Sequence, residues 1–251
     1  MTAPGQPVIE ICVEGIDGLV AAQNAGADRV ELCASLLEGG ITPSFGTVRE
    51  ALRLATIPFH VIVRPRGGDF LYSEAEFASM LADVAALRDL GIAGVVIGCL
   101  TADGDIDEAR TAALVQAARP LSVTCHRAFD MTRDASAALE ALIRCGVDRV
   151  LTSGQRDTAA EGVELLAAMV RLAAGRIVVL GCGALDPANI ADVRARTGLT
   201  EMHFASLKDV PSAMRFRNPN VGMGGTELDR EYRNTVTDGT LVKATIAAAR
   251  T

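Results

Sequence analysis

Eight short apolar runs alternate with segments of helical periodicity along the chain, and this alternation restricts the fold more than any other feature. A repeated strand–helix order requires parallel strands that are covered by helices. Eight such units in 251 residues match the size of one closed barrel, whereas a doubly wound sheet more often has about five to seven strands. The sequence therefore predicts a single α/β domain, residues 1–251, with a TIM-type (β/α)8 barrel. The predicted strands cover residues 8–14, 29–34, 59–66, 94–99, 121–129, 149–154, 176–183 and 201–206.

One long irregular segment, residues 207–231, follows the eighth predicted strand. Loops of this length are uncommon in compact domains unless they close over a site or bind a ligand. Active sites of such barrels lie at the carboxyl ends of the strands, where this segment begins. The sequence therefore predicts a lid or binding segment over the top face of the barrel.

Charge and composition exclude several classes of partner. The net charge of −7 argues against nucleic acid, which normally requires clustered Lys and Arg. No apolar run approaches the length that spans a bilayer, and the N-terminus lacks a signal-peptide pattern. The six cysteines are scattered and form no C-x-x-C pair. We therefore expect a cytoplasmic protein with free thiols, and neither a nucleic-acid nor a membrane partner.

Charged side chains gather near the predicted carboxyl ends of the strands. Consecutive strand residues alternate between the barrel interior and the helix layer, so Cys12 lies on the same side as Glu10, and Cys33 on the same side as Glu31. Such charges are not plausible as unpaired buried groups. The converging set is Glu10, Glu31, Arg64, Arg66, His126, Arg127 and Asp130.

Two interpretations of this set remain open. In the first, Glu10, Glu31 and Arg64 form an internal ion-pair network with His126, and Arg66 at the rim meets solvent or ligand. In the second, the surplus of cations binds a small anion, such as a carboxylate or a phosphate. Glycine-rich turns and hydroxyls after the later strands favour an anion, because phosphate sites of these barrels often lie there. These predicted ligand-binding residues are Ser153, Gly154, Gly181, Gly183 and Ser206.

Four segments resemble the CutC family: "ADRVELCASLLEGGITPS", "IVRPRGGDFLYSEAEF", "VTCHRAFDM" and "RVLTSGQ". The resemblance covers nearly the whole chain. It implies a copper homeostasis protein with a (β/α)8 barrel, a cytoplasmic location, Cu(I) binding and a homo-oligomer. The family name records a copper phenotype rather than a reaction.

Cys12 and Cys33 are the predicted metal ligands. Cu(I) favours thiolate and thioether ligands, and the two cysteines lie on neighbouring predicted strands about 4.8 Å apart. His126, Met214 and Met223 are candidate third ligands. The competing interpretation is that the cysteines pack as small hydrophobic residues.

The alternative function is a barrel enzyme that acts on a small anionic metabolite, with or without a phosphate group. Glu10 or Glu31 would act as general base and His126 as acid, a pairing that suits an isomerase, lyase or hydrolase. The guanidiniums of Arg64, Arg66 and Arg127 would hold the anion.

Overall fold

The computed structural model describes residues 5–223 and 228–251 and confirms the predicted closed barrel. Its eight parallel strands follow one another in chain order, and β1 closes the barrel by pairing with both β2 and β8. The barrel strands are β1 (Val8–Glu14), β2 (Arg29–Cys33), β3 (Phe59–Ile62), β4 (Gly94–Ile97), β5 (Ser122–Cys125), β6 (Arg149–Thr152), β7 (Val178–Gly181) and β8 (Glu201–Phe204).

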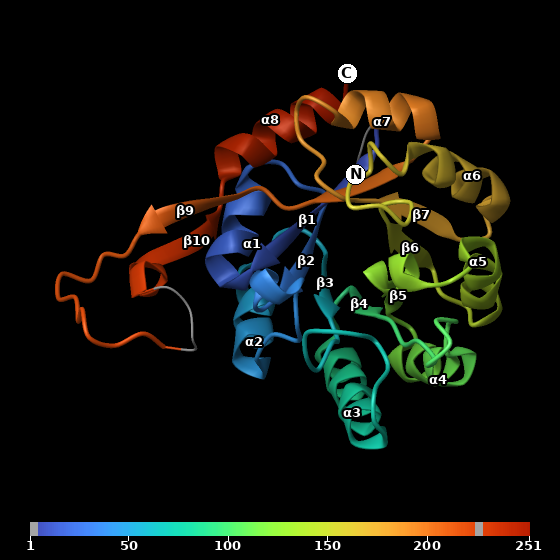
Figure 1. Ribbon diagram of the computed structural model, residues 1–251, viewed down its shortest axis with the longest axis horizontal. Helices are drawn as coiled ribbons and strands as arrows, with labels where there is room; N and C mark the ends of the chain where they lie inside the picture. The colour runs from blue at the N-terminus through green and yellow to red at the C-terminus, as the bar shows by residue number, and fades with distance from the viewer. Residues whose placement is uncertain (1–4, 224–227) are drawn as a thin grey trace.

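Helices surround the barrel on its outside (Figure 1). Helix α3 shows how the sequence sets their bounds, because Ser73 and Glu76 form a reciprocal capping box and Gly91 ends the helix with a φ of 73°. The helices are α1 (Gly15–Asn24), α2 (Phe45–Leu54), α3 (Glu74–Leu90), α4 (Glu108–Ala118), α5 (Ala135–Arg144), α6 (Val163–Ala173), α7 (Ile190–Thr197) and α8 (Gly239–Ala249), with short 3-10 turns η1 (Leu36–Glu38), η2 (Arg127–Met131) and η3 (Leu228–Tyr232).

The alternation predicted for the first strand is present in the structure. Ile9 and Ile11 are fully buried in the main core between the strands and the helices. Glu10 and Cys12 point the other way, into the barrel, where Cys12 packs with Cys33 in a separate small cluster. Among the described residues, no helix combines the length and apolar character needed to cross a membrane.

Seven of the eight barrel strands are shorter than predicted, and in the third and fifth strands this changes the position of several site residues. The third strand ends at Ile62, before Pro65, which has no N–H to extend the ladder. The fifth ends at Cys125, and His126 caps the short turn η2 instead. Arg64, Arg66 and His126 therefore lie on the loops that follow β3 and β5 rather than on the strands.

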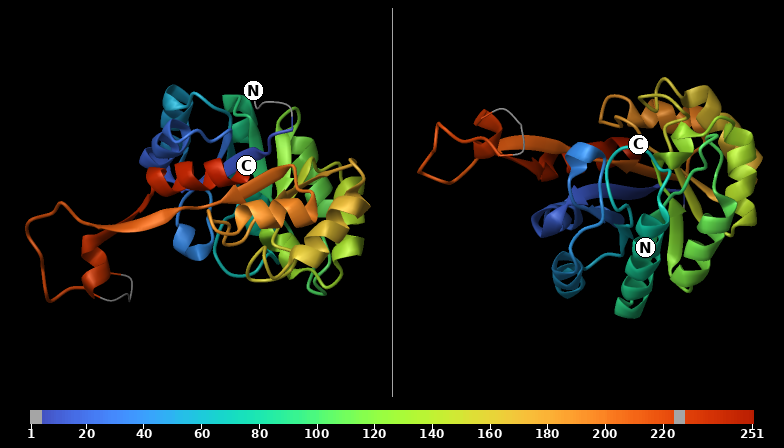
Figure 2. Two further views of the ribbon diagram at one scale, coloured as in Figure 1. Left: turned by 90° about the horizontal axis from the view of Figure 1, so that it is seen from above. Right: turned by 60° about the horizontal axis from the view of Figure 1, so that its bottom comes forward.

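The segment after β8 forms an arm rather than a lid. Its base is a two-stranded antiparallel sheet of β9 (Leu207–Pro211) and β10 (Arg233–Thr237). This sheet continues outward from the side of the barrel, and the arm projects away from the mouth instead of covering it (Figure 2). Part of the predicted lid, residues 224–227, lies outside the described residues.

Candidate functional site

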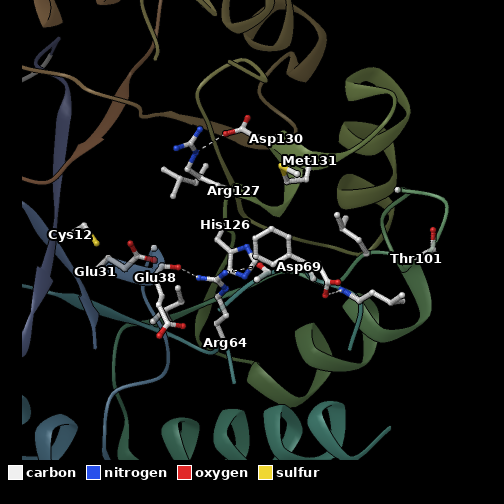
Figure 3. Close-up of a pocket in the computed structure, with 18 of the residues that line it drawn as sticks. Cys12, Glu31, Glu38, Arg64, Asp69, Thr101, His126, Arg127, Asp130 and Met131 are labelled. Atoms are coloured by element: carbon white, nitrogen blue, oxygen red, sulfur yellow. Dashed lines mark hydrogen bonds and ion pairs between the residues drawn. The ribbon is translucent and has the colours of Figure 1, made fainter. Parts of the chain in front are cut away.

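A cavity of about 710 Å³ lies at the end of the barrel where the strands terminate. Strands β1, β2, β3, β6 and β8 contribute to its wall, together with η1 and the loops after β3, β4 and β5 (Figure 3). A volume of this size is typical of small-molecule sites. Its polar lining residues are Cys12, Glu31, Glu38, Arg64, Asp69, Thr101, His126, Arg127, Asp130 and His203.

A buried ion network lies deeper in the barrel, toward the first residues of the strands. Arg29 donates to Glu10, its direct register partner, and also to Glu201 at 2.6 Å. Arg149 donates to the same oxygen of Glu201 at 2.9 Å, and Nδ1 of His203 lies 2.8 Å from Glu10. The network satisfies charges that would otherwise be costly to bury.

This network fixes the charge of the groups at the floor of the cavity. Burial opposes ionisation of Glu10, but Arg29 and His203 outweigh it and hold the pKa of Glu10 well below its usual range. Burial also opposes the charged form of His203, yet contacts with Cys12, Glu10 and Glu31 raise its pKa well above 6.5. Burial raises the pKa of Glu31, and the charge of His203 partly offsets this. Glu10 is therefore a carboxylate and His203 an imidazolium at neutral pH.

The two predicted metal ligands lie side by side. The sulfur atoms of Cys12 and Cys33 are 3.6 Å apart, and both residues are buried free thiols. The register places Cys12 opposite Glu31, so the Glu31 carboxylate stands within 4.8 Å of both sulfurs. The pKa of Cys12 is raised by its contact with Cys33 and by burial. Cys12 lowers the pKa of Cys33, but burial and the charge of Glu31 prevail and raise it to about 11.

Arg64 lies in the cavity wall, but its predicted pairing with Glu10 or Glu31 is wrong. Arg29 takes that role because it faces Glu10 directly across β1 and β2. The Arg64 guanidinium instead bonds to main-chain oxygens of two loops. The acceptors are the carbonyl oxygens of Glu38, Gly40 and Gly68, at 2.6, 3.0 and 2.9 Å.

Arg66 does not line the cavity. Its guanidinium forms ion pairs with Glu76 at 2.6 Å and Asp69 at 3.0 Å, next to the start of α3. Proline at position 65 separates the two arginines, and only Arg64 turns inward. Arg64 and Arg66 therefore do not meet in one anion site, and Arg66 at the rim is held by two carboxylates of the chain.

His126 lines the cavity with one face packed against Phe70, at a centroid distance of 4.9 Å. Its Nδ1 accepts a hydrogen bond from the backbone N–H of Ala128 at 3.1 Å. Burial and the nearby charge of Arg64 lower the pKa of His126 to about 3. His126 is therefore a neutral ring that carries its proton on Nε2.

The predicted anion loop after β6 is already occupied by a carboxylate of the chain. Asp130 accepts hydrogen bonds from the Thr152 hydroxyl at 2.5 Å, from the N–H and hydroxyl of Ser153, and from the N–H of Gln155. Arg127 completes this set with an ion pair to Asp130 at 2.8 Å. Asp130 therefore uses the donors that the sequence assigned to an external anion.

The remaining predicted ligand residues lie outside the lining of the cavity. Gly154 donates to Thr152, and Ser206 accepts the N–H of Asp238 through its carbonyl oxygen. A side chain at Gly181 would collide with Leu199, and one at Gly183 with Ser153. Close packing is thus sufficient to account for both of these glycines. The residues concerned are Ser153, Gly154, Gly181, Gly183 and Ser206.

Sequence reasoning assigned no role to three residues that shape the site, although His203 falls on the eighth predicted strand. Arg29 lies two positions before Glu31, so strand alternation alone could have placed it inside the barrel. His203 is likewise two positions after Glu201 on β8. Phe70 follows the Gly-Gly-Asp loop and carried no local signal, because its position depends on the way that loop folds back.

Comparisons with known proteins identify the family. The CutC family model matches residues 7–208. A family protein CutC of Mesorhizobium japonicum is 76% identical over 244 residues, which cover 97% of this chain and 95% of that protein. A copper homeostasis protein cutC homolog of Mus musculus is 44% identical over 243 residues, covering 97% and 89%. A crystal structure of the putative copper homeostasis protein CutC from Streptococcus agalactiae has a TM-score of 0.75 at 31% identity and covers 79% of this chain and 98% of that chain. None of these names supports the alternative of an enzyme acting on an anionic metabolite.

Proposed function

Because this chain belongs to the CutC family, some of whose members are named copper homeostasis proteins, we propose that it binds Cu(I) through Cys12 and Cys33. The observation that carries this proposal is the distance of 3.6 Å between two buried sulfur atoms. Both sulfurs can therefore reach one ion. Thiolates are the ligands that Cu(I) prefers among protein side chains.

The residues next to Cys12 and Cys33 are compatible with a singly charged soft ion. Two thiolates and one Cu(I) carry a net negative charge, and the imidazolium of His203, in contact with Cys12, offsets it. Glu31 is a hard oxygen donor, more typical of sites for Mg²⁺ or Ca²⁺ than for Cu(I). The two cysteines would hold the ion, and the imidazolium of His203 would offset the remaining negative charge.

The predicted third ligands do not join the cysteine pair. His126 engages Ala128 through Nδ1 on the loop after β5. Met214 and Met223 are exposed residues of the arm, which projects away from the barrel mouth (Figure 2). The proposal therefore rests on two sulfur ligands.

A competition titration tests the proposal with matched variants. Reduced protein is titrated with Cu(I) against a chromogenic Cu(I) chelator. The Cys12→Ser/Cys33→Ser variant should lose high-affinity binding, because a hydroxyl is a poor ligand for a soft ion. The Cys99→Ser/Cys125→Ser variant is the control, since it also removes two buried thiols but lies outside the pair. Equal affinity of the two double variants would eliminate the proposed site.

Two further properties belong to the same proposal. A cytoplasmic location is supported by the free cysteines, because a reducing compartment keeps thiols available for Cu(I). The homo-oligomer remains a prediction from the family resemblance, and light scattering of the purified protein measures it.

A further inference from the structure

Two buried hydrogen-bond donors in the cavity wall have no partner among the described residues. They are Nε of Arg64 and Nε2 of His126, whose residues are 6% and 4% exposed. Both residues line the same cavity. Because a buried donor without an acceptor costs free energy, this wall is suited to a ligand that supplies acceptor oxygens.

Phe70 brings the two donors together. The guanidinium carbon of Arg64 lies 5.0 Å from the centre of the Phe70 ring, and the His126 ring lies 4.9 Å from it. Figure 3 shows Arg64 and His126 next to each other in the middle of the cavity wall. Because Nδ1 of His126 accepts from Ala128, the free nitrogen is the one that carries the proton. The two residues that contact Phe70 therefore each carry a buried N–H group without an acceptor.

Arg64 also carries a positive charge that the chain leaves without an ion pair. Its guanidinium donates to three carbonyl oxygens and lies near the Tyr72 hydroxyl, and no carboxylate of the described residues lies within 4.0 Å of it. Arg127, the other arginine of the lining, is already paired with Asp130. The cavity wall therefore has one unpaired cation, which favours a ligand with a single negative charge.

Glu31 lines the same cavity from β2 and carries a buried oxygen of its own. Oε1 of Glu31 is buried, has no partner among the described residues, and belongs to a residue only 3% exposed. An additional carboxylate there would be repelled, whereas a hydroxyl can hydrogen-bond to Glu31. The lining thus offers an anion-binding wall and a hydroxyl-binding wall.

A phosphate group fits these walls less well. The backbone and hydroxyl donors after β6, which the sequence suggested for phosphate, are taken by Asp130. A phosphate monoester would bring nearly two negative charges to one unpaired guanidinium. The arrangement therefore favours a carboxylate over a phosphate.

We propose that the cavity binds a small unphosphorylated carboxylate that carries hydroxyl groups, with its carboxylate at Arg64 and His126 and a hydroxyl at Glu31. Three features of the lining support this class of ligand: the unpartnered N–H groups of Arg64 and His126, the unpaired charge of Arg64, and the unpartnered oxygen of Glu31. The proposal does not require Cu(I), because its anion-binding residues, Arg64 and His126, lie on the loops after β3 and β5. Its hydroxyl-binding residue, Glu31, lies on β2 beside the cysteine pair, so binding is measured on copper-free protein.

Isothermal titration calorimetry on copper-free, reduced protein tests the proposal by measuring the affinity of four six-carbon probes. Each of the other three probes differs from the first in one property. The probes are D-gluconate, D-glucitol without the charge, D-glucitol 6-phosphate with a phosphate in place of the carboxylate, and hexanoate without hydroxyls. The affinity for D-gluconate should be higher than that for each of the other probes by a factor of about ten or more. Hydrogen bonds to charged groups should provide most of this difference in binding free energy. Preferential binding of the phosphate, equal binding of D-glucitol, or no binding of gluconate would overturn the proposal.

Variants locate the binding. Arg64→Met should weaken gluconate about tenfold or more, and Glu31→Gln should reduce the preference for gluconate over hexanoate. Arg64 also hydrogen-bonds to two loops, so its replacement could disturb the fold. A second variant therefore leaves Arg64 in place. Ala102→Trp places a bulky group at an exposed position of the cavity rim and should abolish gluconate binding.

The matched control is Ala188→Trp, an exposed alanine on the loop after β7, outside the lining. It should bind gluconate as the unmodified protein does. Unchanged gluconate affinity in Ala102→Trp, or equal losses in the two tryptophan variants, would overturn the assignment to this cavity.

Discussion

The three histidines of the chain are all buried, yet their surroundings give them different charges. Burial lowers the pKa of His60 to about 4, and burial with Arg64 lowers that of His126 to about 3. His203 is the exception because its contacts with Cys12 and carboxylates raise its pKa above 6.5. At neutral pH, nitrogen-detected NMR of the metal-free protein should show one imidazolium and two neutral rings. Three neutral rings would contradict this assignment.

The charge of His203 also predicts how stability depends on pH. Its folded pKa is raised, so the stabilisation from its contact with Glu10 is fully present below the ordinary value of 6.5. That stabilisation is lost as the pH rises through the folded pKa. The difference in unfolding free energy between the unmodified protein and His203→Gln should therefore shrink toward alkaline pH in urea titrations. A difference that grows with pH would show that His203 is neutral in the folded state.

The pairing of β1, β2 and β8 determines which arginine is structurally indispensable. Arg29 bridges Glu10 and Glu201 and is 7% exposed. Arg29→Met would leave these carboxylates with fewer partners, and we expect a loss of about 3–5 kcal/mol in unfolding free energy. The control is Arg66→Met, whose ion pairs lie at the surface and should contribute much less. Comparable losses for both variants in urea titrations would contradict the central role of the network.

At the level of elements, strand alternation predicted which side chains enter the barrel but not where each strand ends. Glu10, Cys12, Glu31 and Cys33 share the interior, as their period of two requires. Strand alternation does not apply to Arg64, because β3 ends at Ile62. The loop that follows directs the Arg64 guanidinium toward main-chain oxygens. Loop geometry depends on contacts between distant residues, which periodicity does not encode.

At the level of the whole molecule, the number and order of βα units sufficed to predict the closed barrel. The arm was not predicted as such, because β9 and β10 are separated by a long segment and pair only through a non-local register. The hydrogen bonds of Asp130 were not predicted for the same reason, because their donors come from the loop after β6, which is distant from Asp130 in the sequence. Both features depend on which segments meet in space.

The arm also predicts where proteases act first. Arg215 and Arg217 lie in an exposed stretch beyond β9, whereas the barrel arginines near the site are engaged in buried contacts. Exposed segments with few buried contacts are preferred cleavage sites. Limited trypsin digestion followed by mass spectrometry should show the first cut after Arg215 or Arg217. A first cut within the barrel helices would contradict this order of local stability.

The central claim, that Cys12 and Cys33 hold Cu(I), is tested most directly by X-ray absorption at the copper edge after loading with one equivalent of Cu(I). The 3.6 Å separation of the two sulfurs predicts a first shell dominated by two sulfur scatterers, and Cys12→Ser/Cys33→Ser should lose that shell. A first shell of nitrogen and oxygen alone, or a sulfur shell that persists in the double variant, would contradict the account.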